Sequence, residues 1–96
     1  MFYALLYDYV DDIVTLRAPF REPHLGLVGE FADRGEIVLA GALADPVDGA
    51  IIVFRGESPA IVESFVARDP YMLNGLVPRH SIRPWTLVSG AHRLET

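Results

Sequence analysis

The run from Phe2 to Val10 constrains the fold of this 96-residue chain more than any other stretch, because it is almost wholly apolar and rich in aromatic residues. The side chains of a strand alternate between its two faces. One face would carry Tyr3, Leu5, Tyr7 and Tyr9, and the other Phe2, Ala4, Leu6 and Asp8. Apolar side chains on both faces are typical of a strand that is covered on both sides. The run therefore predicts a strand at the centre of a sheet.

Turn and capping signals predict the remaining elements. Pro23 fits the first position of a helix, and Gly35 fits a left-handed cap at its end. The pattern predicts a helix over residues 23–34, strands over 36–43 and 50–54 joined as a hairpin, a helix after Ser58-Pro59, a short turn from Asp69-Pro70 to Gly75, and a last strand over 79–88. Pro84 predicts that the last strand lies at an edge of the sheet. Gly41 predicts a bulge or a place where a ligand or another backbone comes close.

The element order is βαββαβ within a single domain that spans residues 1–96. This order predicts an α+β fold, a ferredoxin-like sandwich with both helices on one face of a four-stranded antiparallel sheet. The other face would be bare, yet the strands carry apolar residues on both sides, as where Ile37 and Leu39 alternate with Val38 and Ala40. Because a bare apolar sheet is an aggregation hazard, we expect two chains to pack sheet to sheet as a homodimer.

Charge and composition exclude several classes of partner. The net charge of −5 and the pI near 4.9 disfavour nucleic-acid and anionic-membrane partners, and with them an RNA-recognition domain of the same element order. There is no cysteine, so a disulfide, a thiol nucleophile and a cysteine-built zinc site are excluded. The start of the chain lacks the features of a signal peptide, and no apolar run is long enough to span a membrane. We expect a cytoplasmic protein that acts on a small molecule.

His24 is the first candidate for chemistry, because it falls in the first turn of the helix predicted after Arg21. The unpaired N–H groups and the positive end of the helix dipole disfavour imidazolium there, which keeps the ring neutral and usable as a base. The residue also lies on an apolar stripe with Phe20, Leu27 and Phe31, so it should face the protein. The alternative is a core histidine that is bonded to a backbone carbonyl.

Asp69 is the second candidate. An Asp before a Pro is typical of a helix N-cap, and capping alone would account for it. One carboxylate oxygen can cap while the other accepts a hydrogen bond from a histidine, which would orient His24 as a triad aspartate does. Arg21 could bind an anionic or phenolate oxygen, or be an ordinary solvated arginine. Ser81 could line a pocket beside Arg83 and Trp85, or be an ordinary serine of an edge strand.

No other chemistry is indicated. His80 and His92 have no metal-ligand spacing with His24, so no metal site is expected. A nucleophile elbow, a phosphate loop and a dinucleotide fingerprint are all missing from the sequence, so we expect no cofactor.

Four short motifs together resemble the YciI (YCII) family. They are Arg21-x-x-His24-Leu25, Ala40-Gly41, Asp69-Pro70-Tyr71 followed by Gly75, and Ser81-Ile82-Arg83-Pro84-Trp85. The resemblance implies a ferredoxin-like dimer of the dimeric α/β-barrel type, with His24 and Asp69 as a catalytic pair and Ser81 beside them. We expect Arg21, Ser81 and Tyr71 to contact the substrate. The chain departs from the family pattern in Arg83 and Trp85, where Lys and Phe are usual, and in a short hairpin over residues 44–49.

The resulting hypothesis is a small lyase without a cofactor. Neutral His24 would take a proton while a halide leaves, a general-base step that contributes on the order of 10²- to 10⁴-fold. Dehydrochlorination of a chlorinated, hydroxylated aromatic or lactone comes from the resemblance to family members that remove chloride from chloroaromatic breakdown products. The rival hypothesis is a non-catalytic dimeric module that binds a small molecule or a protein, with His24 and Asp69 serving only packing and capping.

Overall fold

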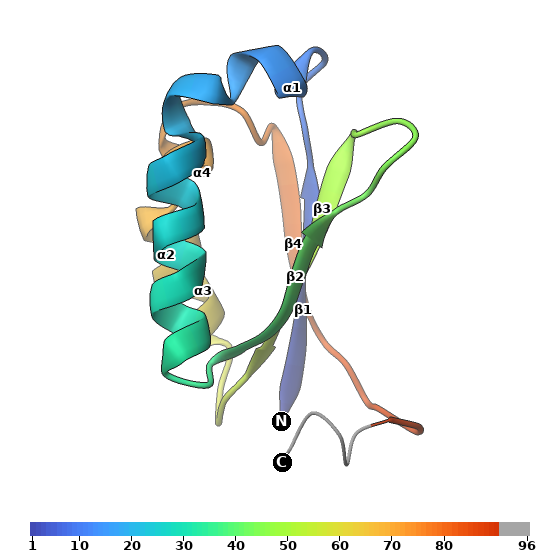
Figure 1. Cartoon of the computed structure of the whole chain (residues 1–96). Coiled ribbons are helices and arrows are strands. Elements are labelled where there is room, and N and C mark those ends of the chain that lie inside the picture. Colours follow the sequence, from blue (N-terminus) through green and yellow to red (C-terminus); the bar gives the residue numbers. More distant parts are fainter. Residues whose placement is uncertain (91–96) are drawn as a thin grey trace.

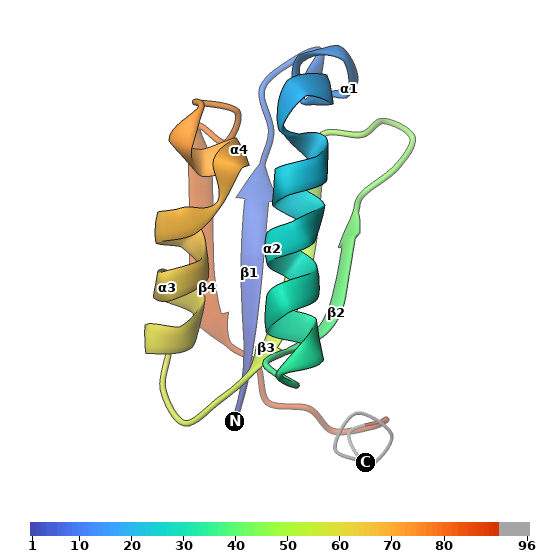
Figure 2. The ribbon, with the colours of Figure 1, turned by 60° about the vertical axis from the view of Figure 1, so that its left-hand side comes forward.

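The computed structural model describes residues 1–90, in which helices cover one face of an antiparallel sheet (Figures 1 and 2). In chain order the elements are β1 (Phe2–Asp8), α1 (Ile13–Leu16), the 3₁₀ helix η1 (Ala18–Phe20), α2 (Arg21–Asp33), β2 (Ile37–Ala42), β3 (Gly49–Arg55), α3 (Ala60–Arg68), α4 (Pro70–Leu73) and β4 (Arg79–Pro84). The predicted α+β class and the ferredoxin-like arrangement are confirmed.

The sheet has the strand order β2-β3-β1-β4, and every neighbouring pair is antiparallel. β1 lies between β3 and β4, so the prediction of a central first strand is confirmed. β4 lies at an edge, as Pro84 predicted. Because β1 is central, its inward side chains meet residues from both long helices, which lie side by side across it in Figure 2.

The core lies between the helices and the sheet. On β1 the alternation is as predicted, with Tyr3, Leu5 and Tyr7 all buried against the helices. Phe31 of α2 and Phe65 of α3 meet edge to face, with ring centroids 5.4 Å apart. Each such fully buried ring stabilises the fold by roughly 1.5–3 kcal/mol relative to an exposed one. The two helices are therefore fixed over the sheet by aromatic packing.

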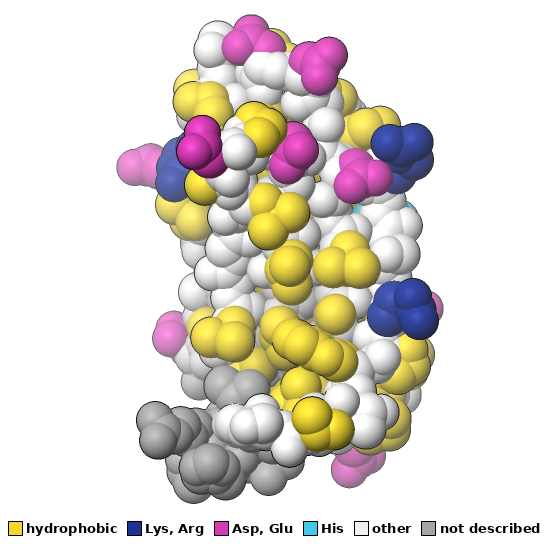
Figure 3. All heavy atoms as spheres, turned by 90° about the vertical axis from the view of Figure 1, so that its right-hand side faces the viewer, with side chains coloured by type: hydrophobic (Ala, Val, Ile, Leu, Met, Phe, Trp, Pro, Cys, Tyr) yellow, Lys and Arg dark blue, Asp and Glu magenta, His cyan; other side chains and the backbone are white. Residues whose placement is uncertain are grey.

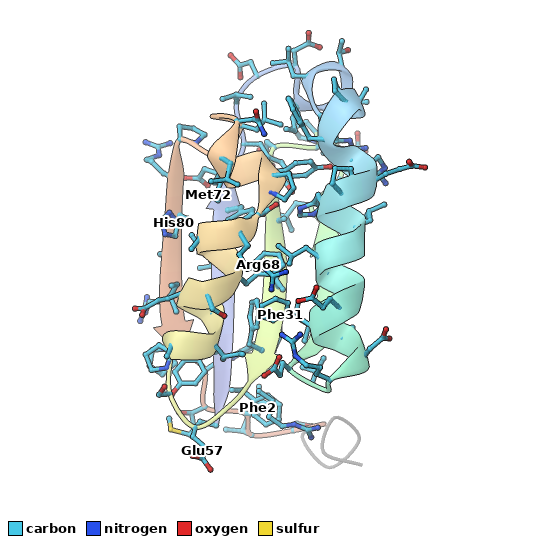
Figure 4. The ribbon with its side chains drawn as sticks, turned by 90° about the vertical axis from the view of Figure 1, so that its left-hand side faces the viewer. Phe2, Phe31, Glu57, Arg68, Met72 and His80 are labelled. Atoms are coloured by element: carbon cyan, nitrogen blue, oxygen red, sulfur yellow. The ribbon has the colours of Figure 1, made fainter. Side chains whose placement is uncertain are left out.

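A network of charges joins the outer surfaces of the same helices. Glu30 of α2 accepts hydrogen bonds from Arg68 of α3 at 2.7 Å and from Arg34 at 3.1 Å. Figure 4 shows Arg68 pointing from α3 toward the seam with α2, where Phe31 lies. These groups are exposed, so the network adds little to stability.

Two predicted boundaries are wrong, and one alternative is excluded. The helix predicted over residues 23–34 is α2, and it begins at Arg21 rather than Pro23, because the 3₁₀ helix η1 already gives residues 18–20 a helical backbone. The last strand ends at Pro84 rather than residue 88, because its partner β1 begins at Phe2, whose carbonyl accepts the last hydrogen bond, from the Trp85 N–H at 2.9 Å. The irregular register of β2 lies between Ile37 and Leu39, which excludes the bulge that was one of the two alternatives for Gly41.

The face of the sheet away from the helices, which we call the open face, carries apolar side chains. Figure 3 shows hydrophobic side chains gathered along this face, with the charged ones mostly toward its margins. Leu6, Leu39 and Ile51 are 37%, 54% and 37% exposed. Leu5, by contrast, is fully buried in the core, so it belongs to the covered face. Among the described residues, no helix is long and apolar enough to cross a membrane.

Candidate active site

His24 and Asp69 meet inside the molecule. The imidazole Nδ1 lies 2.7 Å from Oδ1 of Asp69, although the two residues are 45 positions apart in the sequence. His24 is 8% exposed, and Asp69 is fully buried. His24 therefore bonds a carboxylate, not the backbone carbonyl that the alternative interpretation required.

Asp69 reaches this position because it joins two helices. It follows α3 directly with an extended backbone and forms the N-cap of α4, where Oδ1 accepts from the Tyr71 N–H at 3.0 Å. Its Oδ2 accepts from the Tyr7 hydroxyl at 2.6 Å. The predicted capping role and the contact with the histidine coexist, since the two oxygens of one carboxylate accept all three hydrogen bonds.

Tyr71 packs against the other side of the histidine. Its ring is stacked on the His24 imidazole with centroids 3.8 Å apart and an interplanar angle of 3°. Phe65 contacts the imidazole edge to face, with centroids 6.4 Å apart. The stacked and perpendicular rings hold the imidazole in one plane, which fixes the direction in which its second nitrogen points.

The hydrogen bond to Asp69 defines the roles of the two ring nitrogens. A carboxylate oxygen can only accept, so Nδ1 of His24 carries the shared proton. In the neutral ring Nε2 is then the basic nitrogen. Within residues 1–90, Nε2 has no hydrogen-bond partner. The geometry therefore leaves one lone pair free for proton transfer.

A cavity of about 260 Å³ adjoins this imidazole. Its walls come from α2, from β2 with the following loop, and from β3 and α4. The β2 wall is built of the three small residues Ala40, Gly41 and Ala42. By their register with β3, the side chains of Ala40 and Ala42 lie on the covered face, where their small size leaves room for a ligand. Gly41 pairs with Ile51 of the open face, so it borders the cavity with its backbone alone, and the approach of a ligand there stays a prediction.

Cationic and phenolic groups lie on one side of the cavity. Arg17, Arg21 and Tyr9 line it together with His24 and Tyr71. Burial raises the pKa of Tyr9 to about 12, with Tyr71 and Asp69 adding to the rise and the two arginines opposing it. Tyr9 is thus a neutral hydrogen-bonding group at pH 7. In the described part of the chain, neither Arg17 nor Arg21 has a carboxylate partner.

The predicted site residues separate into two groups. His24, Arg21 and Tyr71 line the cavity, with Asp69 directly behind His24. Ser81 does not reach it. Ser81 pairs with Leu6 across the β1–β4 ladder, and paired residues share a face. It therefore lies on the open face, away from the imidazole.

Sequence reasoning missed Tyr7, Arg17 and Tyr9. Tyr7 has a signal, since a tyrosine on the buried face of a central strand must find a partner for its hydroxyl. Arg17 has none, because its place near Arg21 depends on α1 and η1, which the sequence did not predict. Tyr9 follows the strand in a connection whose direction the sequence does not specify.

The imidazole is not part of a metal-binding cluster. No group of three potential ligands occurs in residues 1–90. Figure 4 places His80 on β4, across the sheet from α2, and His92 lies outside the described residues.

The comparison with protein families decides the assignment of the chain. A family model described as the YCII-related domain matches residues 1–86. The chain belongs to the YCII family. Among curated proteins, none matches this sequence.

Solved structures share the YCII-type fold described above. One is the 5-chloro-2-hydroxyhydroquinone dehydrochlorinase TftG from Burkholderia phenoliruptrix AC1100, in complex with 2,5-dihydroxybenzoquinone, with a TM-score of 0.79, 20% identity and coverage of 96% of this chain and 98% of that one. Another is protein Atu4242 from Agrobacterium tumefaciens, with a TM-score of 0.58, 17% identity and coverage of 94% and 96%. At these identities the likeness establishes the fold.

Proposed function

We propose that this YCII protein is a lyase that needs no cofactor and eliminates HCl from a chlorinated, hydroxylated ring. The observation that carries the proposal is the contact of His24 Nδ1 with Asp69 Oδ1 at 2.7 Å, which leaves Nε2 free beside a cavity. The likeness to TftG, a dehydrochlorinase, supports elimination of chloride over other proton-transfer reactions.

In the proposed reaction the ring is first converted to its keto tautomer, in which a hydroxyl next to the chlorinated carbon becomes a carbonyl and that carbon takes up the proton. Nε2 of His24 then takes the proton of a second hydroxyl that is conjugated with this carbon. The electron pair of that O–H bond forms a carbonyl, the ring double bond shifts to the chlorinated carbon, and chloride leaves with the C–Cl bonding pair. Asp69 stabilises the imidazolium through Nδ1 during this step. The proton then passes from Nε2 to water, so the balance is the loss of one HCl and no external oxidant is needed.

The polar lining favours a substrate that carries an anionic oxygen. Arg17 and Arg21 offer two positive charges without carboxylate partners among the described residues. A guanidinium presents several N–H donors in a plane, which suits a phenolate or carboxylate oxygen. The remaining walls are mostly apolar, and 260 Å³ is below the 300–1,000 Å³ typical of sites for drug-sized ligands, so a compound with one ring fits best.

We further propose that two chains form a homodimer through their open faces. The support is the row of exposed apolar side chains at Leu6, Leu39 and Ile51, with Trp85 47% exposed beside them. Identical apolar faces suit a two-fold interface, which is self-complementary. The cytoplasmic location and the cofactor-free reaction also stay predictions.

Chloride release tests the proposal. Purified protein is incubated with chlorinated hydroquinones, chlorinated lactones and their chlorine-free counterparts, and chloride and proton release are measured together. We expect equal amounts of both from at least one chlorinated compound, unchanged by a chelator and without added nicotinamide or flavin. A thermal-shift screen of the same compounds measures binding alone, since a ligand raises stability as its concentration exceeds the dissociation constant.

The outcomes separate the proposal from its rival. Binding without chloride release, with His24→Ala acting only on stability, would favour the non-catalytic binding module. Chloride release that disappears with a chelator and returns with a metal ion would instead indicate a metal site.

A further inference from the structure

Tyr7 is a buried titratable residue that takes no part in the proton transfer described above. It is 2% exposed, lies on the central strand β1, and does not line the cavity. Its hydroxyl donates to Oδ2 of Asp69 at 2.6 Å, a bond between residues 62 positions apart. Burial, followed by the nearby Asp69 carboxylate, raises the pKa of Tyr7 far above its ordinary value, so the hydroxyl stays protonated and acts as a donor.

The second tyrosine of the same strand face provides a comparison. Tyr3 is similarly buried, at 3% exposed, but within residues 1–90 its hydroxyl has a single hydrogen-bond partner, the sulfur of Met1 at 3.8 Å. Both rings fill the core, so packing alone does not distinguish them. The difference is that Tyr7 contacts the carboxylate that bonds His24.

We propose that Tyr7 is a positioning residue of this site, which holds Asp69 Oδ2 so that Oδ1 stays directed at His24 and which limits how strongly the pair retains a proton. The effect of Tyr7 on kcat rests on the proposed function, whereas its effect on the titration of the His24–Asp69 pair does not. Without Tyr7 the carboxylate would be held on the Oδ1 side alone, by Tyr71 N–H and His24.

The Tyr7 hydroxyl should change the pH at which the His24–Asp69 pair takes up a proton. A hydrogen bond to a carboxylate is stronger when the carboxylate carries its full charge than when imidazolium shares it. The Tyr7 hydroxyl therefore stabilises the unprotonated pair, Asp69 carboxylate with neutral His24, more than the protonated one. Removing it should make the pair take up a proton at higher pH, whichever of the two residues holds that proton.

The substitution Tyr7→Phe leaves the other titratable and charged groups near the imidazole unchanged. They are the stacked Tyr71, the carboxylate of Asp69, and the cavity residues Tyr9, Arg17 and Arg21. A change of titration in Tyr7→Phe is then attributable to the lost hydroxyl.

The experiment follows the His24 imidazole resonance by NMR as pH is varied, in wild type, Tyr7→Phe and the control Tyr3→Phe. The resonance is assigned by its loss in His24→Gln. We expect the midpoint to rise by about 0.5 pH unit or more in Tyr7→Phe, the scale of a lost hydrogen bond to a charged group, and to stay unchanged in Tyr3→Phe. An unchanged midpoint in Tyr7→Phe, or an equal shift in both variants, overturns the proposal.

A measurement on wild type covers the case in which Tyr7→Phe does not fold. The ¹³Cζ resonance of Tyr7 should move in step with the His24 titration, because the hydrogen bond weakens as the pair is protonated. A Tyr7 signal that stays constant through that titration overturns the proposal as well.

Kinetics separate this proposal from the proposed function. On a confirmed substrate, kcat should fall roughly tenfold or more in Tyr7→Phe, as is typical when an outer partner of a reacting group is lost. KM should change little, since Tyr7 does not line the cavity. If wild type releases no chloride from any compound, the proposed function fails while the titration still decides the role of Tyr7. If wild type is active and Tyr7→Phe keeps full kcat, the positioning role fails alone.

Discussion

The rings of His24 and Tyr71 lie parallel, 3.8 Å apart, and the backbone N–H of that same tyrosine bonds the carboxylate that bonds the histidine. One turn of α4 therefore supplies two constraints on a residue of α2, a stacking surface and an oriented acceptor. The site depends on this turn more than on any loop, so substitutions in Asp69-Pro70-Tyr71 should affect folding and chemistry together.

The stability of the site should depend on the shape of residue 69 more than on its charge. In Asp69→Asn, Oδ1 still accepts from His24 and from Tyr71, and the amide nitrogen can donate to the Tyr7 oxygen. We expect a loss of about 1 kcal/mol or less. Asp69→Ala leaves three buried donors unpaired and should cost about 3 kcal/mol or more. Urea unfolding of both variants measures the difference, and equal losses would show that the three hydrogen bonds contribute little.

Arg17 and Arg21 should control binding of an anionic ligand. Replacing either by Gln removes a positive charge from the cavity wall without shortening the side chain much. We expect KM to rise at least about tenfold, near 1.4 kcal/mol, with a smaller change in kcat. The control is the neutral analogue of the same ligand, whose affinity should be unaffected. Equal losses for the charged and neutral compounds would contradict an anion-binding role.

The open face should mediate assembly. Leu39→Asp places a charge on the face proposed to be shared by two chains and should yield monomer in sedimentation at micromolar concentration. Leu73→Asp is the matched control, because Leu73 is 68% exposed on α4, on the helical side. Leu5 is unsuitable for this test, since a charge there would disrupt the core. A wild-type protein that sediments as a stable, folded monomer would refute the sheet-to-sheet dimer.

Acid should weaken the ion pairs of Glu30 that link α2 to α3. Hydrogen bonds from Arg68 and then Arg34 lower the pKa of Glu30 to about 2, from an ordinary value of 4.5. A lowered pKa in the folded state means that the stabilisation is complete above pH 4.5 and is lost as pH falls toward 2. Because these groups are exposed, Glu30→Gln should lower the urea midpoint only slightly at pH 7, and by less at pH 2. Glu63→Gln on α3 is the control and should change neither, and a Glu30 effect that is undiminished at pH 2 would contradict the ion-pair account.

The sequence predicted the element order and the central strand because both depend on local signals. Apolar alternation, proline and glycine act within a few residues, so Phe2 to Val10 and Gly35 could be interpreted directly. The helix start was missed because η1 has no periodicity of its own over three residues.

Site geometry depends on contacts between distant segments. His24 and Asp69 were identified, but their proximity follows only once α2 and α4 pack over β1. The residues alone left Ser81 open between a pocket residue and an ordinary serine of an edge strand, because strand alternation puts it on one face with Arg83 and Trp85 without indicating which face that is. The register of Ser81 with Leu6 supplies that information. The place of Arg17 in the cavity wall depends on α1 and η1, which the sequence did not predict.

The double-mutant cycle on His24 and Asp69 tests the central claim most directly. The measurement is kcat/KM for chloride release in wild type, His24→Ala, Asp69→Asn and the double variant. Loss of the general base should cost about 10²- to 10⁴-fold, and Asp69→Asn should cost less. Because the two residues act as a unit, the double variant should be little worse than His24→Ala alone. Losses that multiply in the double variant, or full activity in Asp69→Asn, would contradict the account.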